Sequence, residues 1–230
     1  MARDFGSVPP ITRRWWAFGH AVLVPPIFWM KRMRVRGRQH VPAAGPVLIV
    51  CNHVSQFDPP TLGLAARHRK SYYMAKQELF RIPGYNYAIW RLGAFPVERG
   101  GADRRALRLA RELLRRGEVL LMFPEGTRRP DGRLRPGLPG AGSLGLEPGV
   151  TVVPAAVWGT QKRFGPIRVV LGPPLDLSDL TDGPRSRRSQ AAVERMMAAI
   201  AGLLPQAGGP AQPAPGSRDP AEAPPEVVDG

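Results

Sequence analysis

Residues 47–58 read Val-Leu-Ile-Val-Cys-Asn-His-Val-Ser-Gln-Phe-Asp, an apolar run followed by a polar segment that carries a histidine and an aspartate. The apolar run predicts a buried strand over Val47–Cys51. Pro59 follows Asp58 and favours a helix start there, with Asp58 as the N-cap and Pro59 as the first helical residue. His53 is therefore expected in a loop between the strand and the helix.

The spacing of His53 and Asp58 indicates a general base and its carboxylate partner. On a continuous helix, residues five positions apart lie about 140° apart around the axis and cannot pair. A loop can fold the imidazole of His53 back onto the Asp58 carboxylate, which would orient the ring and stabilise the imidazolium formed on proton abstraction. A plain helix cap at Asp58 and a hydrogen-bonded loop histidine are the alternative interpretations.

A second polar stretch, Phe123-Pro124-Glu125-Gly126-Thr127-Arg128, comes at the end of another apolar run. Gly126 allows the backbone to approach a ligand closely. The guanidinium of Arg128 can bind a phosphate through two hydrogen bonds. The stretch is therefore a candidate anion site at the end of a strand.

The rest of the pattern predicts strands alternating with helices. Apolar runs predict strands over Val47–Cys51, Ser71–Ala75, Ala94–Val97, Val119–Phe123, Thr151–Val157 and Ile167–Leu171. Between Asp103 and Arg116, Leu and Ala recur at helical spacing opposite arginines, and Gly117 ends the pattern. A last helix is expected over Gln190–Leu204. This order predicts a single α/β domain over residues 41–204.

The composition is that of a folded protein with an unusual charge. Of 230 residues, 43% are hydrophobic and 22% charged, and most of the net charge of +15 comes from arginine. A basic surface suits nucleic acid, anionic lipid or phosphorylated small molecules, whereas an arginine-rich proteome is the alternative explanation. Cys51 is the only cysteine, which excludes an internal disulfide and a cysteine-based zinc site. Its place in a strand favours a small buried hydrophobe over a nucleophile.

The two ends of the chain differ from this domain. Within residues 1–40, the mostly apolar segment Trp15–Met30 is flanked by basic residues and broken by Pro25-Pro26. Because it is too short for a spanning helix, we expect two helices in the interface of an anionic membrane; a helix packed on the domain core is the alternative. Thr12-Arg13-Arg14 resembles an export signal, but no cleavage site follows. Residues 205–230, rich in Pro, Ala and Gly, are expected to be disordered.

Four blocks in order resemble the glycerolipid acyltransferase family, whose type member is 1-acylglycerol-3-phosphate O-acyltransferase. These blocks are His53–Asp58, Lys76–Arg99, Phe123–Arg128 and Val152–Ala155, within a resemblance that extends from about Arg36 to Pro174. The resemblance implies a single α/β domain whose mixed β-sheet is flanked by helices, of the glycerol-3-phosphate acyltransferase-like type. It also implies synthesis of phosphatidic acid for phospholipids.

The resemblance further implies a role for each site residue. His53 would take the proton of the acceptor hydroxyl, and Asp58 would orient its ring. The hydroxyl oxygen would attack the thioester of acyl-CoA or of acyl carrier protein, so no covalent acyl-enzyme, cofactor or metal is implied. The glycerol phosphate of the acceptor would be held by Lys76, Arg99, Glu125, Gly126, Thr127 and Arg128.

One segment departs from the family pattern. Relatives carry an aromatic residue and a lysine before a glycine after the third block, whereas this chain reads Gly137-Leu138-Pro139-Gly140. The acceptor could therefore be another lysolipid or a glycolipid. We expect a peripheral or monotopic enzyme on the cytoplasmic face of the cell membrane. Its expected partners are a lysophospholipid and an anionic membrane surface, without nucleic acid.

Other classes of protein fit the sequence less well. Ser143 lies in a near match to a Gly-x-Ser-x-Gly elbow, but that fold needs a histidine after the serine, and all four histidines precede it. A zinc enzyme lacks clustered ligands. A basic membrane- or nucleic-acid-binding module without catalysis stays open, although the arginine-rich faces lack interleaved aromatic residues.

Overall fold

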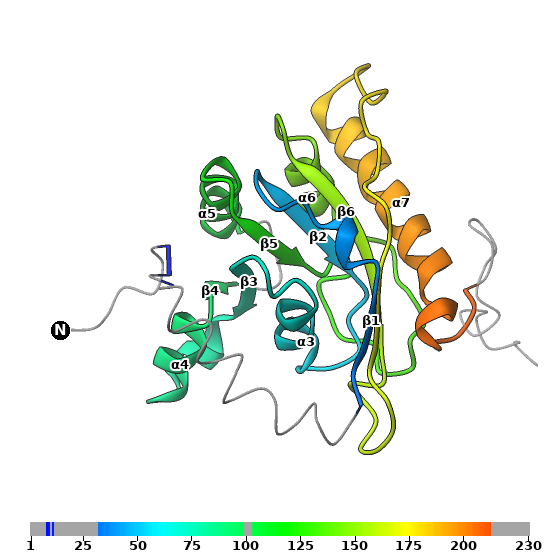
Figure 1. Ribbon diagram of the computed structural model, residues 1–230. Helices are drawn as coiled ribbons and strands as arrows, with labels where there is room; N and C mark the ends of the chain where they lie inside the picture. The colour runs from blue at the N-terminus through cyan, green and yellow to red at the C-terminus, as the bar shows by residue number, and fades with distance from the viewer. Residues whose placement is uncertain (1–7, 10, 12–31, 99–102, 213–230) are drawn as a thin grey trace, which may run out of the picture.

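The computed structural model describes residues 8, 9, 11, 32–98 and 103–212 (Figure 1). One sheet runs through the domain, with seven strands in the order β1-β7-β6-β2-β5-β3-β4. The strands are β1 (Arg34–Arg36), β2 (Val47–Cys51), β3 (Ser71–Lys76), β4 (Ala94–Val97), β5 (Val119–Met122), β6 (Thr151–Trp158) and β7 (Arg168–Leu171). The prediction of a single α/β domain with a mixed sheet is confirmed.

The strands from β2 to β6 all run in the same direction. β2 pairs in parallel with β5 and with β6, and β3 pairs in parallel with β5 and with β4. β7 runs antiparallel to β6, and β1 pairs in parallel with β7, so these two strands run opposite to the other five. The carboxyl ends of β2 to β6 therefore meet at one edge of the sheet, which we call the carboxyl edge.

Helices cover both faces of the sheet (Figure 1). They are α3 (Asp58–Ala65), α4 (Tyr85–Arg91), α5 (Arg104–Arg115), α6 (Pro139–Gly145) and α7 (Arg185–Leu203), with short 3-10 helices at Arg38–His40, Gln77–Arg81 and Pro205–Ala207. Leu48 and Val50 of β2 pack in the apolar layer that includes residues of α5, α6 and α7, and Ile49 and Cys51 pack in the layer that includes α3. Burial on both faces explains the continuous apolar run of β2.

The predicted elements agree with the observed ones to within a few residues. Asp103 caps α5 by accepting a hydrogen bond from the Ala106 N–H over 2.9 Å, and Gly117, with φ 74°, follows its end. α7 begins at Arg185, five residues before the predicted Gln190, because its first turn is exposed and carries no apolar periodicity.

Packed residues lie beyond both boundaries predicted for the domain. Within the segment 1–40, Ile11 is buried in the core and Arg34–Arg36 form the edge strand β1. After residue 204, Ala207 is fully buried, and the Gln212 side chain bonds to the Leu134 N–H and the Gly132 carbonyl. A three-residue edge strand and a short packed turn carry too little apolar pattern to be visible in sequence.

The helices expected within Trp15–Met30 and the tail after residue 212 lie outside the described residues. Among the residues that the structure does describe, no helix has the length and apolar character needed to cross a bilayer.

Candidate active site

The candidate site lies at the carboxyl edge, where loops leave neighbouring strands. β2 leads into Asn52 and His53, and β5, its neighbour in the sheet, leads into Phe123 and Glu125. Ligands bind at the carboxyl ends of parallel strands in open α/β sheets, because the loops that leave these strands gather there. Two blocks about seventy residues apart in the chain are thereby brought side by side.

His53 and Asp58 form the pair predicted from their spacing. The Nδ1 atom of His53 lies 2.7 Å from Oδ2 of Asp58. His53 is 8% exposed, and Asp58 is completely buried. The loop between β2 and α3 folds back as expected, so that the imidazole ring meets the carboxylate at the start of the helix.

The Asp58 carboxylate is surrounded by hydrogen-bond donors. Its Oδ2 also accepts the N–H groups of Val54, over 2.8 Å, and of Ser55, over 2.7 Å. Its Oδ1 accepts the hydroxyl of Thr160 over 2.6 Å. Because every neighbour donates, Asp58 acts only as an acceptor. Nδ1 of His53 must then carry the proton, which leaves the lone pair on Nε2.

The prediction that Asp58 is the N-cap of the helix was wrong in detail. The helix begins at Asp58 itself, with Phe57 in the capping position and no side-chain cap. The carboxylate points backwards, to N–H groups of the loop that precedes the helix. Pairing with His53 therefore takes the place of capping.

Asn52 fixes the end of the strand that precedes His53, and Phe123 packs on the His53 ring. The Asn52 side chain accepts the Val157 N–H over 2.8 Å and donates to the Val157 carbonyl over 3.0 Å, which fixes the end of β2 against β6. The His53 ring stacks on Phe123, with ring centroids 4.1 Å apart and an angle of 23° between the planes. The imidazole is thus positioned by packing as well as by its carboxylate.

Glu125 faces inward, towards backbone rather than solvent. Its Oε1 accepts the His53 N–H and its Oε2 accepts the Arg135 N–H, each over 3.2 Å. Burial raises the pKa of Glu125 from its ordinary 4.5 to about 7, although these two N–H groups and the nearby Arg129 oppose the shift. Glu125 thereby links the His53 loop to the loop after β5. Its predicted contact with the acceptor stays a prediction.

The turn after Glu125 presents the predicted anion-binding residues. Gly126 has φ 66°, a left-handed conformation that suits glycine, and its N–H bonds to the Phe123 carbonyl. Thr127 is half-buried and Arg128 exposed. No ion pair of Arg128 is found among the described residues.

Arg129, the next residue along the chain, is a further candidate for the anion site. Its N–H donates to the His53 carbonyl over 2.6 Å, so its backbone adjoins the base. Its side chain is 29% exposed and contacts Asp131 at 3.4 Å. The Nε atom is buried without a hydrogen-bond partner among the described residues. A buried guanidinium nitrogen that lacks a partner is a signal only the structure provides.

The other predicted site residues lie apart or outside the described chain. Lys76 ends β3, so it stands on the carboxyl edge two strands from β2; its side chain is 41% exposed and 3.8 Å from Glu78. Arg99 lies outside the described residues. The structure therefore brings together His53, Asp58 and the Phe123–Arg128 turn, and places Lys76 farther along the same edge.

Thr160 is a further residue that sequence reasoning missed. It is 3% exposed and donates to Asp58 from the loop after β6, although 102 positions separate the two residues. No local pattern marks Thr160 in the sequence, because its role depends on the pairing of β6 with β2.

The residues behind the rival interpretations have structural roles. Ser143 lies within α6, where its hydroxyl accepts a hydrogen bond from Arg111 over 3.1 Å. Cys51 is fully buried at the end of β2, as predicted, and burial raises the pKa of its thiol well above the ordinary value. Neither residue is placed to act as a nucleophile at the carboxyl edge.

Comparison with known proteins agrees with this geometry. Two relatives are 1-acyl-sn-glycerol-3-phosphate acyltransferases. The one from Bacillus subtilis is 29% identical over 170 residues, covering 71% of this chain and 84% of that protein. The one from Pseudomonas aeruginosa is 30% identical over 185 residues, covering 74% and 70%.

A solved structure supports the same relationship. The crystal structure of PlsC from Thermotoga maritima, a 1-acyl-sn-glycerophosphate (LPA) acyltransferase, superposes with a TM-score of 0.62 at 25% identity, over 83% of this chain and 76% of that one. Residues 32–158 match the Acyltransferase family, a span that contains both halves of the site. The chain belongs to the acyltransferase family.

Proposed function

We propose that this acyltransferase moves a fatty acyl chain from a thioester to the free hydroxyl of 1-acylglycerol-3-phosphate, which gives phosphatidic acid. The observation that carries the proposal is the His53–Asp58 pair, 2.7 Å apart and supported on every side by donors. The relatives from B. subtilis and P. aeruginosa bear the name of this activity and support the choice of acceptor.

The geometry suits direct transfer. With Nδ1–H bonded to Asp58, Nε2 of His53 takes the proton of the acceptor hydroxyl as the oxygen attacks the thioester carbonyl carbon. The new C–O bond forms and the C–S bond breaks. The thiolate then leaves with the proton that His53 holds, so the histidine returns to its starting form. A base placed in this way contributes about 10²- to 10⁴-fold in rate.

The acceptor phosphate is a dianion that suits the cations of this edge. Arg128 is exposed beside Gly126, and the half-buried Arg129 adjoins His53 through its backbone. Guanidinium groups bind phosphate through paired hydrogen bonds, which fixes its orientation as well as its position. Lys76 and Arg99 are the further phosphate ligands we propose. The donor is acyl-CoA or acyl carrier protein, without a cofactor or a metal.

The direct test is transfer of a labelled acyl chain by the purified full chain. Palmitoyl- or oleoyl-CoA is offered with lysophosphatidic acid beside other lysolipids, and loaded acyl carrier protein is the second donor. We expect product from lysophosphatidic acid and its loss in His53→Ala. His68→Ala is the matched control, because His68 is an exposed histidine whose ring bonds to the Val41 carbonyl, away from the candidate site. Normal turnover of His53→Ala would contradict the mechanism.

A different acceptor is the second candidate, and the segment Gly137–Gly140 favours it. A Cβ at Gly137 would lie 2.5 Å from the Val193 side chain, so this position holds no larger residue. Leu138, beside Gly126, is 56% exposed. This exposed apolar side chain would suit a less charged head group. Product from another lysolipid or a glycolipid, and none from lysophosphatidic acid, would identify that acceptor.

We also infer that the chain works as a peripheral or monotopic protein on the cytoplasmic face of the cell membrane. Its acceptor is an amphiphile, and Trp15–Met30 carries tryptophans between basic clusters. Serine at Trp15, Trp16 and Trp29, which leaves the buried Ile11 in place, should weaken sedimentation with anionic vesicles and leave the circular dichroism spectrum unchanged. An unfolded product would instead support packing of this segment on the core.

A further inference from the structure

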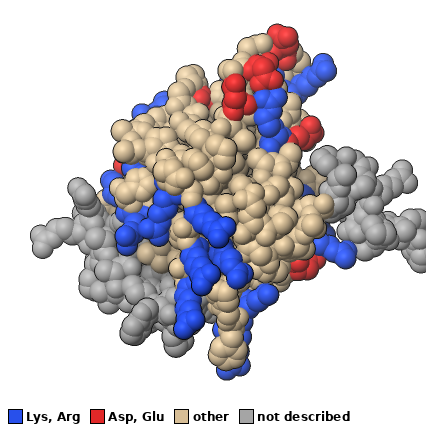
Figure 2. All heavy atoms as spheres, turned by 45° about the vertical axis from the view of Figure 1, so that its right-hand side comes forward, with Lys and Arg blue, Asp and Glu red and all other residues tan. Residues whose placement is uncertain are grey.

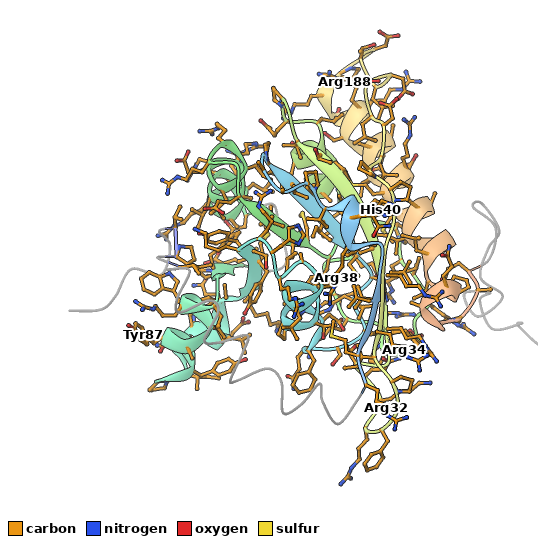
Figure 3. All side chains as sticks on the ribbon, viewed as in Figure 1. Arg32, Arg34, Arg38, His40, Tyr87 and Arg188 are labelled. Atoms are coloured by element: carbon orange, nitrogen blue, oxygen red, sulfur yellow. The ribbon has the colours of Figure 1, made fainter. Side chains whose placement is uncertain are left out.

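One edge of the sheet, on the side of β1, carries a concentration of positive charge. Its residues come from β1 and the turn before it, from β7 and from the hairpin loop between β6 and β7. We call them the basic edge: Arg32, Arg34, Arg36, Lys162, Arg163 and Arg168. Arg34 lies beside Arg168 in the register of β1 and β7. Together with Arg36 and Gln206, these two arginines line a small cavity of about 70 Å³. Figure 3 labels Arg32 and Arg34 at the lower end of the molecule.

The basic edge has no acidic counterpart in its own segments. Residues 32–41, 158–175 and 205–212 contain no Asp or Glu. Figure 2 shows Lys and Arg gathered over the lower half of this side of the molecule and most of the Asp and Glu at its upper end. Such a separation of charge creates a surface that attracts an extended anionic partner.

The hairpin adds an apolar tip to this charge. Phe164 is 79% exposed, the largest exposed fraction among the large hydrophobic residues that the structure describes. The guanidinium carbon of Arg163 lies 5.5 Å from the centre of the Phe164 ring, and Lys162 Nζ lies 5.5 Å from that of Trp158. An aromatic residue beside cations is the combination that binds at a bilayer interface, where the ring enters the acyl boundary and the cations meet head groups.

The hairpin projects on the same side as the candidate active site. β6 runs parallel to β2 and holds Val157 against Asn52, next to His53. The loop of residues 159–166 continues beyond that level before β7 returns, and Figure 1 shows it as the lowest part of the domain. At its root, Thr160 is bonded to Asp58. A surface that receives the tip would therefore face the catalytic pair.

We propose that the tip of the β6–β7 hairpin, with the basic edge behind it, docks on an anionic bilayer and turns the active site towards the membrane. The proposal rests on the proposed function, because it explains how a lipid acceptor reaches His53 from the bilayer. It adds a contact in the folded domain to the one expected from the N-terminal segment. Nucleic acid fits the tip less well, since a single Phe between cations gives no series of stacking rings.

The first test places a reporter at the tip of the full chain. Cys51 is fully buried, so a cysteine introduced by Phe164→Cys is the accessible thiol for a polarity-sensitive dye, and unsubstituted protein serves as the blank. Arg108→Cys, at an exposed position on α5, is the matched control. With vesicles of equal parts phosphatidylcholine and phosphatidylglycerol, we expect a blue shift at position 164 and none at 108. An unchanged spectrum at 164 would overturn the proposal.

The second test removes charge and apolar surface. Lys162→Ser with Arg163→Ser should weaken binding to the same vesicles about 10- to 30-fold, because each nearby cation favours an anionic surface. Phe164→Ser should weaken it about tenfold. Arg108→Ser with Arg187→Ser removes equal charge from exposed positions elsewhere and should leave binding unchanged. Equal binding by the tip variants and this control, or retention of the chain by duplex DNA instead of vesicles, would overturn the proposal.

Activity distinguishes this proposal from the proposed function. The tip variants should keep wild-type transfer to a lysophosphatidic acid dispersed in detergent and lose it on vesicles. Failure of the wild type with every acceptor in detergent would contradict the proposed function alone. Full activity of the tip variants on vesicles would contradict docking alone.

Discussion

The hydroxyl of Thr160 donates to Oδ1 of Asp58 over 2.6 Å, and both residues are buried. This bond connects the loop after β6 to the partner of the catalytic base. The other carboxylate oxygen is already occupied by His53 and by two backbone N–H groups. Thr160 is therefore the residue that completes the environment of Asp58.

Thr160→Val should lower kcat/KM about tenfold and stability by about 1–3 kcal/mol, because it leaves one oxygen of a buried carboxylate without a donor. Thr160→Ser keeps the hydroxyl and should restore both properties. Loss of stability in Thr160→Val with wild-type kcat/KM, measured on folded protein, would limit Thr160 to a structural role.

Asp58→Asn removes the charge of the carboxylate but keeps a side chain of the same shape in the loop. The amide oxygen can still accept the N–H groups of Val54 and Ser55, and the amide nitrogen can donate to Thr160. We expect stability within about 1 kcal/mol of the wild type, and turnover about 10²- to 10⁴-fold lower because the imidazolium loses its counter-charge.

Asp58→Ala is the comparison for that experiment, since it also leaves the loop N–H groups unpaired. It should lower the free energy of unfolding by about 1 kcal/mol for each hydrogen bond that is lost. Urea denaturation measures both variants. Equal destabilisation by Asn and Ala would show that the hydrogen bonds inferred around Asp58 do not hold the loop.

Glu125 makes the stability of the protein depend on pH. Its pKa lies at about 7 in the folded chain against an ordinary 4.5, so the folded state holds a proton that the unfolded state has lost between these values. The stabilisation is complete below pH 4.5 and is lost as pH rises through 7, in total about 3 kcal/mol.

Glu125→Gln should flatten this dependence, because an amide does not titrate. It should also lower stability by about 1 kcal/mol at acidic pH. The reason is that its NH₂ group would face the backbone N–H of His53 or of Arg135, and two donors cannot form a hydrogen bond. Thermal unfolding of both proteins across pH 5 to 8 gives the comparison. Parallel curves would place the titration on another group.

Gly126→Ala tests the turn that carries the proposed phosphate site. A Cβ there would combine a φ of 66° with an approach of 2.7 Å to the Leu138 side chain. Gly149 has φ 74° with nothing within 4 Å of a Cβ, so Gly149→Ala is a control for the backbone strain alone.

Both alanine variants should lose about 1–2 kcal/mol from the left-handed conformation. Gly126→Ala should lose more than Gly149→Ala and should also raise KM for the acceptor. Addition of Leu138→Ala should remove the difference in stability between the two. If Leu138→Ala leaves that difference intact, the side-chain contact is not its cause.

The sequence by itself determined the features that depend on near neighbours. β2 is a strand because five apolar residues are buried on both faces, and α5 is a helix because its apolar stripe follows a capping Asp103. The His53–Asp58 pair was also predictable, since the six-residue loop between β2 and α3 leaves few ways to place the ring.

Only the tertiary structure decided what depends on the order of the strands. Thr160 reaches Asp58 because β6 pairs with β2, and Glu125 reaches the His53 N–H because β5 pairs with β2 on its other side. The basic edge exists because the short strand β1 joins β7. Local pattern specifies which segments form strands, but their order in the sheet results from packing among distant parts of the chain. The order of the strands thereby placed Thr160 against Asp58 and Glu125 against the His53 loop.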